Sequence, residues 1–141
     1  MRTLVFISAS LLAATGAQAT QSAEQRTAMR DNRVEATATA RNISRERDPE
    51  VRGASCHVFL SLSMNAHRSR AVGYNEAAME RARSLYYADV VRRLGGWQVA
   101  DQLIGSSANP LEPALPAARD AASRWCVQHA PPRVLARRRH R

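Results

Sequence analysis

The sequence predicts an all-α protein, a small up-and-down bundle of about four helices with a disordered N-terminal leader and C-terminal tail. Aromatic residues make up 5% of the chain and alanine is abundant, a composition that favours helices over sheets. Apolar residues recur at helical spacing in the second half, and 141 residues suit one domain. The expected parts are a signal peptide at 1–19, a flexible polar leader at 20–53, a helical domain at 54–130 and a basic tail at 131–141.

The N-terminus has the pattern of a secretory signal peptide. Arg2 precedes an apolar run from Leu4 to Ala14, and small residues at Ala17 and Ala19 form a cleavage site, so we expect cleavage after Ala19. The apolar run would rise only about 16 Å as a helix, roughly half of a bilayer core. We therefore expect no transmembrane segment in the mature chain and a periplasmic or secreted location.

All 21 basic residues are arginine, which indicates the codon bias of a GC-rich bacterial genome. This bias weakens any argument that a single arginine was selected to bind phosphate or carboxylate. Together with the signal pattern, it predicts a protein of the bacterial envelope.

Residues 20–53 form a polar segment with seven arginines and six acids. Its few large apolar side chains cannot offset the entropy of ordering the segment. We expect a flexible leader with a break at Asp48-Pro49. The alternative is a leader that folds on a partner.

The longest amphipathic segment begins at Asn75, which is a good N-cap. Arg92 and Arg93 suit a last helical turn, and Gly95 can end the helix in the left-handed conformation. The predicted core face comprises Met79, Ala82, Tyr86, Val90 and Leu94.

Three further helices are predicted around this one. Ser55 caps the first of them, and Gly105 ends the second. Three prolines predict a loop before the third. The expected ranges are 56–68, 97–104 and 116–129 for the helices and 106–116 for the loop.

Cys56 begins the first of these helices, and Cys126 lies near the end of the last. An up-and-down order brings these two helix ends together. Exported cysteines oxidise, so we predict a Cys56–Cys126 disulfide. Closing so long a loop stabilises the fold by about 4 kcal/mol in the chain-entropy model.

The cysteines allow two weaker interpretations. A catalytic redox pair usually has the C-x-x-C spacing, which the sequence lacks. Cys126, His129 and Cys56 could supply three metal ligands, but an exported cysteine pair oxidises first. We therefore expect neither a metal nor another cofactor.

Asp89 lies one helical turn before Arg92 and Arg93. The favoured interpretation is a solvated rim with helical ion pairs, because exposed pairs of this spacing are common. The alternative is a partly buried network that includes Arg83 and Tyr86 and lines a pocket.

The last nine residues contain five arginines and no acid. They are either a solvated end or an electrostatic attachment to anionic lipid or lipopolysaccharide. Nucleic acid is not an expected partner, because no aromatic residues interleave with the tail and an exported protein rarely meets DNA. The candidate contacts with an anionic surface are Arg133, Arg137, Arg138, Arg139 and Arg141.

The opening of the first core helix, Cys56-His57-Val58-Phe59-Leu60, resembles the start of the core in small periplasmic acid-stress chaperones of the HdeA type. The resemblance covers these five residues and implies an all-helical fold with one disulfide. The cysteines are further apart here, and the leader and basic tail are additional to the pattern, so we claim no membership.

The sequence contains no Ser–His–Asp order, H-E-x-x-H pair, Walker loop or G-x-G-x-x-G motif. We therefore predict a non-enzymatic binding or structural protein, with an anionic envelope lipid or an envelope protein as candidate partner. The alternative is a stress holdase that exposes apolar helix faces when it loosens. A third hypothesis is a small hydrolase that uses His67.

Overall fold

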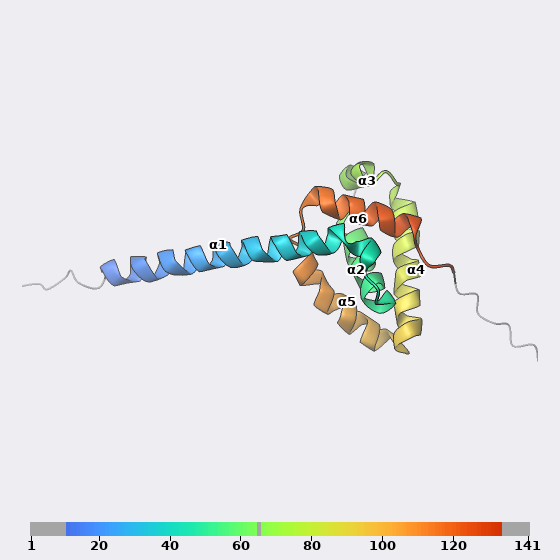
Figure 1. The fold of residues 1–141 in the computed structure, drawn as a ribbon, viewed down its shortest axis with the longest axis horizontal. Coiled ribbons are helices and arrows are strands. Elements are labelled where there is room, and N and C mark those ends of the chain that lie inside the picture. The colour runs from blue at the N-terminus through green and yellow to red at the C-terminus, as the bar shows by residue number, and fades with distance from the viewer. Residues whose placement is uncertain (1–10, 65, 134–141) are drawn as a thin grey trace, which may run out of the picture. The chain divides into compact units, whose positions relative to one another are not determined.

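The computed structural model describes residues 11–64 and 66–133, and it confirms the all-α class. Two units divide the chain, residues 1–31 and residues 32–141. Within the described residues there are six α-helices and one 3₁₀ helix rather than about four helices (Figure 1). These are α1 (Leu11–Arg41), η1 (Ile43–Arg45), α2 (Pro49–Leu62), α3 (Ala66–Val72), α4 (Glu76–Leu94), α5 (Trp97–Leu111) and α6 (Pro116–Gln128).

The described part of the first unit belongs to α1. Side chains from residue 22 to residue 31 are exposed. Arg26 Nε and Thr27 Oγ1 donate to backbone carbonyls one turn earlier, at 3.2 and 3.0 Å. The polar composition that predicted a leader therefore gives a solvated helix here.

The second unit is built around α2, which packs against α4, α5 and α6 (Figure 1). Gly53 allows α2 to approach α4 closely, because a Cβ atom at this position would lie 2.7 Å from Val90 Cγ2. Seven residues of α2 are buried: Gly53, Ala54, Ser55, Cys56, Val58, Phe59 and Leu60.

The start of α2 differs from the prediction, because the helix begins at Pro49 and not at Cys56. Asp48 Oδ1 accepts hydrogen bonds from the backbone N–H groups of Glu50 and Val51, at 2.9 and 3.3 Å. Proline is favoured at the first helical position, so Asp48-Pro49 starts a helix where we expected a break. Ser55, the predicted cap, lies buried inside the helix.

The predicted domain boundary at residue 54 also lies too late in the chain. Ala36, Thr37, Ala40 and Ile43 are all at most 4% exposed, so the second half of the expected leader contributes to the core. The search for large apolar residues missed this segment because most of its core side chains are small. Small side chains allow close helix packing without contributing much to a hydropathy pattern.

The first predicted core helix is divided into two. α2 ends at Leu62, and His67 lies on the separate helix α3 with an exposed side chain. Arg124 closes the end of α3, donating from Nε to Val72 O and from Nη2 to Ala71 O, each at 2.8 Å. His67 therefore does not lie on the same helix as Cys56.

The predicted loop at 106–116 is wrong over most of its length, because α5 continues to Leu111. Gly105 does not end the helix, and Pro110 lies in its last turn. The hydroxyls of Ser106 and Ser107 both donate to Leu103 O, at 2.9 and 2.7 Å. These bonds are compatible with a continuous helix, so Gly and Pro alone were poor guides to its end.

α4 and α6 agree closely with the prediction. Asn75 Oδ1 accepts from Ala78 N at 2.8 Å, and Gly95 has the left-handed φ of 77° that ends α4. The predicted face of α4 is buried at Met79, Ala82, Tyr86 and Val90. α6 covers Pro116–Gln128, one residue shorter than expected.

The predicted disulfide joins Cys56 and Cys126, with a Cα–Cα distance of 5.6 Å. Both residues are fully buried. The contact arises because α6 runs antiparallel to α2, so that the end of α6 meets the middle of α2 while Asp120 lies near Ser63. This antiparallel arrangement is the feature from which the sequence predicted the bond.

Two predicted features lie partly or wholly outside the described residues. These are positions 1–10 of the signal peptide and the tail arginines 137, 138, 139 and 141. In the part of the chain that the structure describes, no helix has both the length and the hydropathy needed to cross a membrane.

Candidate functional site beside helix α4

A cleft of about 790 Å³ lies between α4 and the segment that follows α6. Figure 1 shows this segment passing beside α4. We call it the α4 cleft. Its lining residues are Arg81, Ser84, Leu85, Ala88, Asp89, Pro132 and Arg133.

The periodicity of α4 places the cleft on the side of the helix away from its main core face. Arg81, Leu85 and Ala88 follow one another at spacings of four and three residues, so they share one helical face. Met79, Ala82 and Tyr86 form the buried face. The same helix therefore contributes both to the core and to the cleft.

Asp89 is the acidic residue of the cleft, and its charge is already compensated. It is 9% exposed, its Oδ1 accepts from Arg92 Nη2 and its Oδ2 accepts from Arg93 Nε, both at 2.7 Å. Burial alone would raise the pKa of Asp89, but the hydrogen bonds from Arg93 and Arg92 outweigh it and hold the pKa below its ordinary value. The carboxylate is thus bound by two guanidinium groups.

This geometry matches neither of the two interpretations of Asp89 completely. The carboxylate is buried and lines a cleft, as in the alternative, but two expected members of the network bind elsewhere. Arg83 pairs with Glu80 at 2.7 Å. Tyr86 donates its hydroxyl to Cys126 O at 2.7 Å, which links α4 to the last turn of α6.

The hydrogen bond between Tyr86 and Cys126 helps to position the end of α6. The segment after this end, with Pro132 and Arg133, lines the cleft opposite α4. Burial raises the pKa of Tyr86, so its hydroxyl remains a hydrogen-bond donor. The adjacent disulfide joins the same turn of α6 to α2. The segment that contains Pro132 and Arg133 therefore leaves a helix end held by a covalent bond and a hydrogen bond.

The cleft combines apolar and cationic side chains. Leu85, Ala88 and Pro132 supply apolar surface, while Arg81 and Arg133 supply two guanidinium groups. Guanidinium groups form strong charge-assisted hydrogen bonds with carboxylates and phosphates. Since Asp89 is bound by other arginines, the cleft suits an anion that also carries an apolar portion.

A second group of titratable side chains surrounds His57. The rings of His57 and Tyr87 lie 5.9 Å apart, and the Tyr87 hydroxyl donates to Asp101 Oδ1 at 2.8 Å. Burial, with a contribution from Arg83, lowers the pKa of His57, and its buried Nδ1 has no hydrogen-bond partner. The Ser61 hydroxyl donates to the backbone carbonyl of His57 at 2.7 Å and not to the His57 ring.

A buried polar network that sequence reasoning missed connects α2 with α6. The Ser123 hydroxyl lies 3.0 Å from that of Ser63 and donates to Phe59 O at 3.1 Å. Asp120 Oδ2 lies 3.5 Å from Arg68 Nη1. Because Ser63 and Ser123 are fully buried, the network stabilises the helix packing and offers no open site.

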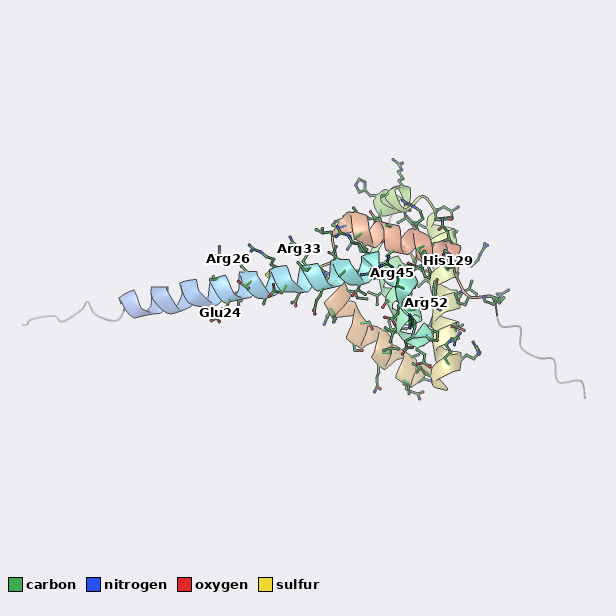
Figure 2. All side chains as sticks on the ribbon, viewed as in Figure 1. Glu24, Arg26, Arg33, Arg45, Arg52 and His129 are labelled. Atoms are coloured by element: carbon green, nitrogen blue, oxygen red, sulfur yellow. A yellow bond between two sulfur atoms is a disulfide. The ribbon has the colours of Figure 1, made fainter. Side chains whose placement is uncertain are left out.

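The structure separates the ligands of the metal interpretation. Cys56 and Cys126 are joined to each other. The ring of His129, which Figure 2 labels, stacks on Trp125 with centroids 4.3 Å apart. Over the described ranges, no group of three or more His, Cys, Asp or Glu side chains could hold a metal ion.

Of the predicted surface contacts, Arg133 lies in the α4 cleft. Arginines 137, 138, 139 and 141 are outside the described residues. Sequence reasoning missed Arg81, Leu85 and Pro132 as partners of Arg133, because only the fold brings α4 to the start of the tail. The available signals were the helical spacing of Arg81 and Leu85 and their position off the predicted core face of α4.

Comparisons of the chain with protein-family models, curated proteins and solved structures found no match.

Proposed function

We propose that this chain is an exported, non-enzymatic binding protein of the bacterial envelope that attaches to anionic lipid through the α4 cleft and the arginine tail. The observation that carries the proposal is that Arg81 and Arg133 line the same cleft as the apolar residues Leu85, Ala88 and Pro132, while Asp89 is bound by other arginines. These features match a lipid with a negative headgroup and apolar chains.

The cysteine pair supports the location. A buried disulfide fits an oxidising compartment outside the cytoplasm. The signal pattern at 1–19, with cleavage after Ala19, supports the narrower assignment to the periplasm or the exterior.

Charge supports the choice of ligand. The net charge of the full chain is +9, and the nine residues from Arg133 contribute five arginines without an acid. Anionic lipid surfaces attract such clusters, and each basic residue near the surface contributes about 1 kcal/mol. Arg133 belongs to both the cleft and the tail, so one surface contact can engage both.

Retention of the protein on phosphatidylglycerol vesicles tests this function. Replacing two arginines that each contribute about 1 kcal/mol should weaken binding roughly 30-fold. We therefore expect that loss for Arg81→Gln/Arg133→Gln, and a further decrease after deletion of residues 137–141. Binding of the unaltered protein should also weaken as salt rises.

The matched control is Arg26→Gln/Arg30→Gln, which removes the same charge from exposed positions of α1. This variant should lose only a small part of the binding. Equal retention of both double variants would rule out the cleft as the lipid site.

A further inference from the structure

The charges at the α4 cleft do not balance. Among the described residues that line it, Asp89 is the only acid, and Arg92 and Arg93 both bind its carboxylate at 2.7 Å. These three side chains together retain one positive charge. The lining residues Arg81 and Arg133 add two more, so four arginines accompany one acid and the local net charge is +3.

The positive charges of Arg81 and Arg133 are not neutralised by neighbouring acids. Among the described residues, no acid forms an ion pair with either of them. Glu80, which precedes Arg81 in the sequence, pairs with Arg83 at 2.7 Å, and no acid follows Asp120. The residues three and four positions away from Arg81 on α4 are uncharged; they are Ala77, Ala78, Ser84 and Leu85. Because this argument depends on where the acids lie, a codon bias towards arginine does not weaken it.

The excess of positive charge favours an anion with more than one negative charge. A phosphate diester, such as the headgroup of phosphatidylglycerol, carries a single negative charge. A phosphate monoester carries about −1.5 to −2 at pH 7 and presents three strong acceptor oxygens. Each guanidinium group has five N–H donors, so Arg81 and Arg133 can supply donors for all three oxygens.

The apolar side chains of the cleft indicate that the ligand is more than a free phosphate ion. Leu85, Ala88 and Pro132 line the same cleft as the two arginines, and its volume is about 790 Å³. Small-molecule sites typically have volumes of about 300–1,000 Å³. An alkyl chain next to the phosphate would contact these side chains, whereas an inorganic ion would leave them in water.

We propose that the α4 cleft selects lipids whose headgroup is a phosphate monoester over lipids whose headgroup carries a single negative charge. This inference rests on the proposed function, because it narrows the ligand of the same site. The selection comes from the second negative charge of the monoester, which the uncompensated positive charge of the cleft can bind. Attraction by the arginine tail should depend on surface charge in general and should not distinguish the two headgroups.

Octyl phosphate and octyl sulfate, both below their micelle concentrations, are a matched pair of probes. They have the same chain and three terminal oxygens, but only the phosphate gains a second negative charge above about pH 6. In NMR titrations at pH 8, the disulfide-bonded protein should bind octyl phosphate about fivefold more tightly, the factor expected for one additional charge contact.

The preference should disappear at pH 5, where both probes carry one negative charge. Asp89 should remain ionised at that pH, because its pKa lies below the ordinary value. The guanidinium groups of Arg81, Arg92, Arg93 and Arg133 remain charged throughout. Taking the ratio of the two affinities removes the effects of protein titration that both probes share, so a change in this ratio reports on the phosphate.

A single substitution in the cleft tests whether the preference belongs to this site. Arg81→Gln removes one of the uncompensated charges, so it should weaken the binding of both probes and reduce the preference for octyl phosphate at pH 8. The matched control is Arg30→Gln, which removes one charge from an exposed position of α1 and should keep the preference.

The outcomes separate this inference from the proposed function, which retention on phosphatidylglycerol vesicles tests independently. Equal affinity of the unaltered protein for the two probes at pH 8, no binding of either probe, or an undiminished preference in Arg81→Gln would overturn the inference alone. Absence of binding to both the probes and the vesicles would overturn both. Binding of inorganic phosphate as tight as that of octyl phosphate would show that the cleft takes the free ion and would overturn the lipid assignment.

Discussion

At Gly53 the absence of a side chain decides how closely α2 and α4 pack. Gly53→Ala would place a methyl group 2.7 Å from Val90 Cγ2, so one helix would have to shift. Overpacking of this kind costs about 1–3 kcal/mol. The helix-propensity gain of up to about 1 kcal/mol offsets part of this cost. We therefore expect the free energy of unfolding, measured by urea denaturation, to fall by up to about 2 kcal/mol.

Gly105→Ala is the matched control for this prediction. Gly105 also lies within a helix, but an added Cβ would meet no atom within 4 Å. Replacing a helical glycine by alanine stabilises by up to about 1 kcal/mol. Equal effects of the two substitutions would contradict the close packing of α2 on α4.

The partly buried position of His57 predicts how stability depends on pH. Its pKa is lowered by burial and by Arg83, against the opposing effects of Glu80 and Asp101. The unfolded chain therefore takes up a proton more readily than the folded one, so stability should decline as the pH falls below the ordinary value of 6.5. His57→Gln should show a smaller decline between pH 7 and pH 5 in urea denaturation. An unchanged pH dependence would show that His57 does not control it.

At the scale of helices, the local sequence predicted a helix correctly where its capping residues and its apolar face indicated the same range. α4 has Asn75 at one end, Gly95 at the other and a buried stripe between them, and all three features predicted it. In α5 the same rules failed, because Gly105 and Pro110 are accommodated inside the helix. A helix breaker ends a helix only when the surrounding packing does not favour its continuation.

Small core residues explain the failure at the N-terminal side of the bundle. Ala36 and Ala40 are buried by contacts with other parts of the chain, which no local pattern reveals. The candidate site likewise depends on contacts between distant parts of the chain. Arg133 was identified from the charge of the tail, whereas Arg81 became a candidate only when the fold placed α4 beside it.

At the scale of the whole chain, the disulfide was predictable because helix order and compartment pointed to the same pair. Cys56 and Cys126 are fully buried, so a reductant cannot reach the bond without some opening of the fold. This burial fits a structural role for the bond. The proposed attachment to lipid instead uses surfaces that the closed bundle already presents.

The most direct test of that attachment is an NMR titration of the disulfide-bonded protein with dodecyl phosphate below its micelle concentration. We predict saturable shifts of the backbone amides of the non-proline residues that line the α4 cleft, and their loss in Arg81→Gln/Arg133→Gln; these residues are Arg81, Ser84, Leu85, Ala88, Asp89 and Arg133. Saturation with no shifts in these residues would contradict the assignment of the cleft as the anionic-lipid site.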